Sequence, residues 1–311
     1  METTSPLPFS SLSEAPVLGQ TLGNIDVLRL DQVGARAPGN KLFKLRLNLQ
    51  RLREQGQTRV LSFGGGWSNH LHALAAVGAE QGLETIGIVR GGETETAMLR
   101  DARAWGMQLV AVDRTEYRRR NEPEYQQVLR RRFGSCVVLP EGGANAEAVL
   151  GCRAIADAIN QRPESIDRVF VPVGSGATLA GLAAALAPDI QLHGISALRG
   201  AQDLEARVQM LLTEVGQVAN VPWRIHHEFH CGGFARVNGA LREFMLDFEA
   251  VHAIPLEPVY TAKMFYAVAQ LLRDKGVSPH ERLVLVHTGG LQGRRGFAWL
   301  NQAGDGQVSG T

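Results

Sequence analysis

The sequence has few of the features that mark secreted, membrane or nucleic-acid-binding proteins. Only three of its 311 residues are cysteines, Cys136, Cys152 and Cys231, and no two of them form a metal-type pair. Three thiols are too few for a disulfide framework, so we expect a reducing, cytoplasmic compartment and no metal site. The net charge is only +1, which gives no overall attraction to nucleic acid or to a membrane.

Long hydrophobic runs and a recognisable leader are also lacking. No apolar stretch reaches the roughly 18 residues that a membrane helix needs. The first residues, METTSPLPFSSLSE, contain no basic segment followed by an apolar one, so we expect no signal peptide. Charge is concentrated in two arginine triplets, Arg118–Arg120 and Arg130–Arg132. Acidic residues lie close by, so we interpret both triplets as solvated helix faces rather than phosphate contacts.

Glycine is abundant and punctuates an alternation of strand and helix patterns. Such alternation predicts an α/β fold with open, mostly parallel twisted sheets covered by helices on both faces, in three αβα layers. The predicted strands are Val27–Leu30, Arg59–Phe63, Thr85–Val89, Gln108–Val112, Cys136–Leu139, Arg168–Val173, Gln191–Ser196, Ile225–Phe229 and Arg282–His287. The predicted helices are Leu42–Gln55, Ser68–Gln81, Thr94–Trp105, Ala146–Ile159, Ala177–Ala187, Leu204–Val215, Leu241–Val251 and Ala262–Lys275.

Ligands in such sheets bind where strands run into helices, so these turns are the informative places. In FGGGWSNH three glycines precede Ser68 and Asn69, either of which can cap a helix and leave amide groups free for an anion. VGSGAT, with Gly174 and Thr178, is typical of a phosphate-binding turn but lacks the nucleoside-triphosphate pattern. Taken alone, HTGG around Thr288 and PVYTAKM around Tyr260 are weak signals.

Lys41 stands at an unfavourable place for a cation. In APGNKLFKLR, Asn40 is the expected helix cap and Lys41 the first helical residue, at the positive end of the helix dipole. A positive field lowers a lysine pKa, and a neutral lysine is a nucleophile that can link to a carbonyl cofactor. Leucines recur at helical spacing on one face, so Lys44 and Arg51 are interpreted as ordinary residues of the opposite, polar face.

These segments together resemble the 1-aminocyclopropane-1-carboxylate deaminase and D-cysteine desulfhydrase family of fold-type-II, tryptophan-synthase-β-like pyridoxal-phosphate enzymes. GNKLFKL is similar to the family's GNKxRKL, GGGWSNH to GGxxSNH, GSGATLAGL to its phosphate loop, and PVYTAKM to PVYTGKAM. LPEGGANAEAVLG and HTGG also correspond to family segments, in the same order along the chain. SNH and PVYT, with His70 and Thr261, are nearer the desulfhydrase branch than the deaminase branch, which resembles SNQ and PVYEGK.

The resemblance implies pyridoxal 5'-phosphate as cofactor and a small amino acid as substrate. Lys41 would carry the cofactor, and Lys41, Tyr260 and Ser68 would be the catalytic residues. The expected cofactor contacts are Lys41, Asn69, Gly174, Ser175, Gly176, Ala177, Thr178, Tyr260 and Thr288, and the expected substrate contacts are Ser68, Asn69 and His70. It further implies two domains, a larger one of residues 1–44 and 148–311 and a smaller one of residues 45–147, and a homodimer.

The expected reaction is α,β-elimination from D-cysteine or a related β-substituted amino acid, giving a keto acid and ammonia. A neutral Thr288 at the ring nitrogen favours this reaction over one that needs a long-lived carbanion. Phe43 and Phe234 stand where the family has arginine and tyrosine, so a non-catalytic carrier or sensor of the cofactor is an open alternative. A nucleotide-binding α/β protein that uses the GSGAT turn is another.

Overall fold

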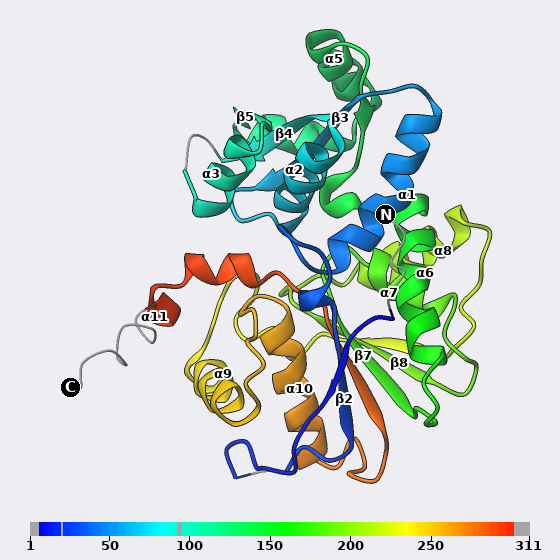
Figure 1. Cartoon of the computed structure of the whole chain (residues 1–311), viewed down its shortest axis with the longest axis vertical. Coiled ribbons are helices and arrows are strands. Elements are labelled where there is room, and N and C mark those ends of the chain that lie inside the picture. Colours follow the sequence, from blue (N-terminus) through cyan, green and yellow to red (C-terminus); the bar gives the residue numbers. More distant parts are fainter. Residues whose placement is uncertain (1–5, 20, 92–94, 302–311) are drawn as a thin grey trace.

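The computed structural model describes residues 6–19, 21–91 and 95–301, and these form two sheets. Figure 1 shows them in two parts of the molecule, joined where the blue helix α1 (Asn40–Glu54) runs between them. We call the part around the four-stranded sheet the small lobe and the part around the six-stranded sheet the large lobe. Among the described residues, no helix has both the length and the hydrophobicity to span a lipid bilayer.

The large lobe holds a six-stranded sheet in the order β1-β2-β10-β7-β8-β9. Its strands are parallel except β1, which runs antiparallel to β2. Their bounds are β1 Phe9–Ser11, β2 Ile25–Arg29, β7 Arg168–Val173, β8 Gln191–Ser196, β9 Trp223–His226 and β10 Leu283–His287. The helices of this lobe are α6 (Ala146–Asn160), α7 (Ala177–Ala183), α8 (Leu204–Glu214), α9 (Gly239–His252), α10 (Thr261–Arg273) and α11 (Ala298–Asn301), with 3-10 turns η1 (Leu30–Gln32) and η4 (Leu291–Gly296).

Side chains alternate between two buried faces of this sheet. Val284 and Val286 of β10 join the core under α6, α7 and α8, whereas Leu283 and Leu285 join the core under α9 and α10. A strand with two covered faces reads as a continuous apolar run, which explains sequences such as VFVPV and LVLV. The lobe is therefore a three-layer αβα arrangement, as predicted.

The small lobe repeats this plan with a parallel sheet in the order β5-β4-β3-β6. Its strands are β3 Arg59–Gly65, β4 Glu84–Arg90, β5 Gln108–Val112 and β6 Val137–Val138. Its helices are α2 (Asn69–Gln81), α3 (Ala97–Ala104), α4 (Arg114–Arg118) and α5 (Pro123–Phe133), with 3-10 turns η2 (Arg119–Asn121) and η3 (Glu141–Gly143). Leucines and alanines of α2 pack on one face, and Tyr117, Tyr125 and Leu129 cover the other.

Helix α1 belongs to both cores. Phe43 packs in the core of the large lobe, while Leu45, Leu49 and Leu52 pack in that of the small lobe. The chain thus crosses between the sheets within the first turns of α1, directly after Lys41. The domain boundaries at residues 44–45 and 147–148 stay a prediction.

Most predicted elements are present, and the differences have local causes. The antiparallel strand β1 was missed because three residues are too few to show a period, and α4 and α5 were missed because their sequences are mostly polar. The predicted strand Ile225–Phe229 is shifted to 223–226. The predicted helix that starts at Thr94 begins at Ala97, and Thr94 lies outside the described residues.

Candidate active site

The start of α1 is joined to the HTGG loop that follows β10. The amide of Asn40 donates to the carbonyl oxygen of Thr288 at 3.1 Å. Gly39 precedes the helix with φ 132°, and a Cβ placed on it would lie 2.5 Å from the same oxygen. Only glycine fits at this junction. The prediction that Asn40 is the cap was wrong, because Gly39 holds that position and Asn40 is the first helical residue.

The side chain of Asn40 links Lys41 to the glycine-rich turn after β7. Its Nδ2 donates to Thr178 Oγ1 at 3.0 Å, and its Oδ1 accepts from Lys41 Nζ at 2.9 Å. Burial and, to a lesser extent, the neighbouring charge of Lys44 together lower the pKa of Lys41 to about 7, against smaller opposite effects of Cys152 and Glu257. The lowered pKa expected from the sequence is therefore present, but burial rather than the helix dipole is its main cause.

Lys44 is not the solvated residue that the helical pattern predicts. It is buried, and its Nζ donates to Ser175 Oγ at 2.9 Å and to the carbonyl oxygen of Gly142 at 3.1 Å. Burial lowers its pKa. The prediction failed because both faces of α1 are covered here, one by each lobe. Lys44 is thus a cation directed at the turn that was predicted to bind phosphate.

This turn, Gly174–Thr178, lies directly beneath Tyr260. A Cβ on Gly174 would lie 3.0 Å from the Tyr260 ring, so glycine is needed for the ring to approach the turn. Gly176 has φ 89° and precedes α7, whose first residues are Ala177 and Thr178. The structure therefore gathers Lys41, the predicted phosphate turn and the predicted stacking aromatic at one place.

The GGGWSNH loop lies at the carboxyl end of β3. Ser68 caps α2 by accepting from the amide of Leu71 at 3.2 Å, and its hydroxyl hydrogen remains available to a ligand. Asn69 Oδ1 accepts from Gln292 Nε2 at 2.9 Å, which leaves the two hydrogens of its Nδ2 free to donate, close to Gly290. Gln292 was missed by the sequence reasoning, since nothing in the sequence shows that η4 crosses to this loop.

His70 faces the interior of the small lobe. Its Nε2 lies 2.8 Å from Ser62 Oγ, and its Nδ1 is buried beside Gly143 without a hydrogen-bond partner. Burial and the two lysines of α1 lower its pKa to about 3, so the imidazole is neutral. It adds no positive charge to the predicted carboxylate site, and its part in substrate binding stays a prediction.

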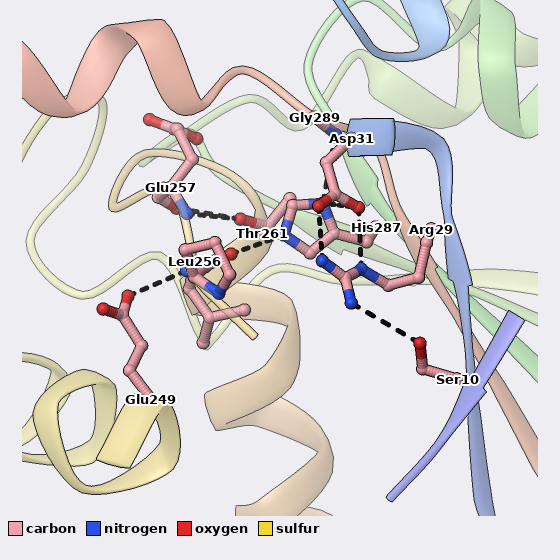
Figure 2. Close-up of polar contacts among 10 residues, drawn as sticks. Ser10, Arg29, Asp31, Glu249, Leu256, Glu257, Thr261, His287 and Gly289 are labelled. Atoms are coloured by element: carbon pink, nitrogen blue, oxygen red, sulfur yellow. Dashed lines mark hydrogen bonds and ion pairs between the residues drawn. The ribbon is translucent and has the colours of Figure 1, made fainter. Parts of the chain in front are cut away.

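Glu257 is a further site residue that was missed. Its carboxylate is buried and accepts from the amides of Val259 and Tyr260, each at 2.8 Å, which fixes the start of α10. Burial raises its pKa to about 7, against the effect of those two amides. Figure 2 shows Glu257 beside Thr261, whose hydroxyl bonds the Glu257 backbone at 2.7 and 3.1 Å. An acidic residue directly before PVY was the available signal.

A buried cluster supports Thr288 from below. Arg29 donates to both carboxylate oxygens of Asp31 at 2.9 and 2.7 Å, and His287 lies beside them (Figure 2). His287 Nε2 donates to the carbonyl oxygen of Pro255 at 2.8 Å, and its Nδ1 accepts from the amide of Gly289 at 3.3 Å. The HTGG loop is therefore held rigidly, although the predicted contact of Thr288 with a ring nitrogen stays a prediction.

These residues fit a phosphate-bearing aldehyde cofactor. Lys41 offers an amine whose pKa of about 7 leaves a substantial neutral fraction at neutral pH, Lys44 and the 174–178 turn offer a cation and hydroxyls for a phosphate, and Tyr260 offers an aromatic face. Among the described residues, no cluster of histidine, cysteine and carboxylate side chains could hold a metal ion. The chemistry of this donor set is that of pyridoxal phosphate.

Comparison with known proteins agrees. Residues 10–289 match the family model described as "Pyridoxal-phosphate dependent enzyme". The chain belongs to this family. Pyridoxal phosphate is its cofactor, and this pyridoxal-phosphate enzyme is of the 1-aminocyclopropane-1-carboxylate deaminase and D-cysteine desulfhydrase type.

Its relatives carry both of those names. A protein of Thermotoga maritima provisionally named 1-aminocyclopropane-1-carboxylate deaminase is 30% identical, over 87% of this chain and 89% of its own length. The D-cysteine desulfhydrase of Salmonella newport is 26% identical, over 92% of each chain. A solved structure described as an "ACC deaminase homologue" superposes with a TM-score of 0.83 at 25% identity, over 96% of this chain and 94% of its own.

Proposed function

We propose that this enzyme is a lyase that removes a β-substituent from a small amino acid, with D-cysteine or a close relative as substrate. The products are a keto acid, ammonia and the departing group, which is sulfide when cysteine reacts. The observation that carries the proposal is the amine of Lys41, which is linked through Asn40 to Thr178 of the 174–178 turn and has a pKa of about 7.

The residues around the cofactor would have distinct binding roles. Lys41 would carry the cofactor, while Lys44 and the 174–178 turn would hold its phosphate. Asn69, oriented by Gln292, would donate from Nδ2 to an oxygen of the cofactor ring. Ser68 and the amides at the start of α2 would hold the substrate carboxylate, where the helix end favours an anion.

The proton transfers follow from the different pKa shifts. When bound, pyridoxal phosphate withdraws electrons from the α-carbon of an amino acid. The free amine of Lys41 has a pKa of about 7, which would suit it to take the α-proton. Burial and the charges of Glu257 and Glu141 raise the pKa of Tyr260, so its phenol stays protonated and would hydrogen-bond to the departing thiolate, while the Lys41 ammonium, which has the lower pKa, would supply the proton. Water then converts the released enamine to keto acid and ammonia.

Position 261 favours elimination over ring opening of 1-aminocyclopropane-1-carboxylate. Thr261 is buried and engaged with the Glu257 backbone at the first turn of α10. The deaminase branch resembles PVYEGK, with a glutamate at this position, so the carboxylate of that motif is absent here. His70, which replaces the glutamine of SNQ, is neutral and bound to Ser62.

The test is an assay of the cofactor-saturated enzyme against D- and L-cysteine, β-chloroalanine, serine and 1-aminocyclopropane-1-carboxylate, with keto acid, ammonia and sulfide measured together. We expect equal amounts of the three products from one cysteine enantiomer. Tyr260→Phe should lower kcat more than it changes KM. Turnover of 1-aminocyclopropane-1-carboxylate in preference to every β-substituted amino acid would contradict the proposal.

A further inference from the structure

A group of arginines surrounds a hollow in the small lobe, next to the active site. The cavity has a volume of about 400 Å³ and is lined by Arg90, Arg114, Tyr117, Arg118 and Arg120. Arg90 ends β4, and the other three arginines follow β5, on α4 and η2. The hollow therefore lies at the carboxyl edge of the parallel sheet, where α/β proteins bind ligands.

Tyr117 forms the base of this arginine pocket. The guanidinium carbons of Arg90 and Arg120 lie 5.5 and 5.0 Å from the centre of its ring. Its hydroxyl donates to Glu141 Oε1 at 2.8 Å, and Arg120 pairs with Glu141 Oε2 at 2.8 Å. Two of the guanidinium groups are thus held in place by an aromatic face, while only Arg120 has a carboxylate partner.

The other three charges of the arginine pocket have no acidic partner in the described part of the chain, 6–19, 21–91 and 95–301. The nearby acids are engaged elsewhere. Asp113 caps α4 at 2.7 and 2.8 Å, Glu116 accepts from Tyr125 at 2.8 Å, and Glu122 pairs with Arg119 at 2.9 Å. Three cations that form no ion pair within the described residues, gathered around one hollow, favour the entry of an anion.

The arginine pocket adjoins the loops that form the active site. Arg90 is paired in register with Gly65 of β3. A Cβ added to Gly65 would lie 3.6 Å from Arg90 Nη2, so the guanidinium group lies close to this glycine. Gly65 begins the turn that leads to Ser68. On the other side, Glu141 precedes Gly142, whose carbonyl oxygen accepts from Lys44. A ligand in the pocket would lie beside two loops of the small lobe that border the cofactor site.

We propose that Arg90, Arg114, Arg118 and Arg120 bind the phosphate or carboxylate group of a small molecule, which revises the interpretation of Arg118–Arg120 as only a solvated helix face. Guanidinium forks match such groups in pairs of parallel hydrogen bonds. The size of the hollow fits a small molecule, and a net charge of +1 gives no overall attraction to a nucleic acid. The anion is either the far end of an amino acid substrate or a separate metabolite.

The decisive experiment is a calorimetric titration of the cofactor-saturated enzyme with inorganic phosphate. Saturation with cofactor fills the 174–178 turn, so any further binding reports a second site. We expect one phosphate to bind per chain. The double variant Arg114→Ala/Arg118→Ala should bind phosphate at least roughly 13-fold more weakly, because the loss of one charge-assisted hydrogen bond costs about 1.5 kcal/mol. Both side chains are exposed and make no described hydrogen bond, so the variant should fold.

Arg130→Ala/Arg131→Ala is the matched control, since it removes two exposed arginines of α5 outside the pocket. It should bind phosphate as the wild type does. Absence of saturable binding to the wild type, or equal binding by the double variant at Arg114 and Arg118, would overturn the site, whatever the activity of the enzyme proves to be.

Inhibition kinetics then identify the source of the anion. If the substrate carries the anion, phosphate should compete with the amino acid. The double variant should then show a raised KM and an unchanged kcat for substrates with a distal carboxylate. Phosphate that binds without competing indicates a separate metabolite. Both patterns support the site, because each requires the binding that the titration measures.

Discussion

Lys44→Met gives the sharpest test of the phosphate side of the cofactor site. The substitution keeps the length of the side chain and removes its charge. Lys44 Nζ has two neutral acceptors, Ser175 Oγ and the Gly142 carbonyl, so a phosphate beside the turn would be its first anionic partner. Loss of one charge-assisted hydrogen bond costs about 1.5–3 kcal/mol. At about 1.36 kcal/mol per factor of ten, the affinity for pyridoxal phosphate should fall roughly 13- to 160-fold.

The cofactor-free chain should respond in the opposite direction. Burial lowers the pKa of Lys44 in the folded state from 10.5, so the unfolded chain binds more protons between the lowered pKa and 10.5. Stability should therefore rise with pH in that range, because ∂ΔG/∂pH is positive where the unfolded state binds more protons. Removing the buried cation should leave the cofactor-free variant equally or more stable near pH 7 and reduce this rise.

The assay has two parts. Equilibrium dialysis or fluorescence quenching gives the cofactor dissociation constant, and urea unfolding at about pH 7 and about pH 9 gives the stability of the cofactor-free chain. Arg46→Met, an exposed cation of the same helix, is the control and should change neither quantity by much. Unchanged cofactor affinity in Lys44→Met, with full stability, would refute the assignment of Lys44 to the phosphate.

Three further predictions concern the loops that meet at Lys41. Gly289→Ala should lower the free energy of unfolding by about 1–3 kcal/mol, because the new Cβ would lie 2.6 Å from a backbone oxygen. Gly82 has a similar φ and free space around it, so Gly82→Ala should lower the free energy of unfolding by less. Equal losses of stability in the two variants would contradict this. Gln292→Ala should weaken cofactor binding about 2- to 13-fold, because it removes the one neutral hydrogen bond that orients Asn69. An unchanged cofactor dissociation constant would exclude this orienting role of Gln292. Cofactor capture by the cofactor-free chain should accelerate up to about pH 7 and then level off as Lys41 loses its proton, whereas a rate that climbs steadily toward about pH 10 would indicate an ordinary lysine.

Local sequence patterns predict the strands and helices and their order along the chain. They do not predict which polar side chains are buried. Buried parallel strands such as VFVPV carry a signal within six residues, so the α/β class was predictable. Helical spacing assigned Lys44 to a solvated face, because it describes one helix and cannot show that a second lobe covers the opposite side. The same limit hid Gln292, whose partner Asn69 lies in a loop distant in the sequence. Glu257 bonds amides only two and three residues further on, but its burial could not be seen from the local pattern.

The resemblance to a family placed the cofactor turn and Lys41, but the reasons for these positions required the structure. Gly39 and Gly289 approach each other so closely that a Cβ on either would meet the backbone of the other segment. Their close approach joins the start of α1 to the end of β10. Asn40, expected as a cap, instead connects Lys41 with Thr178. The short polar helices α4 and η2, which carry three of the four arginines of the pocket, gave no periodic signal.

The central claim is that Lys41, and neither Lys44 nor Lys263, carries the cofactor. Lys44 and Lys263 are more fully buried than the half-buried Lys41, and burial lowers their pKa values too, so all three lysines are candidates for the label. The direct measurement is borohydride reduction of the cofactor-saturated protein, followed by digestion and mass spectrometry of the labelled peptide. The account predicts a pyridoxyl group on Lys41 alone, absent from Lys41→Ala. A label on Lys44 or Lys263, or no label at all, would contradict it.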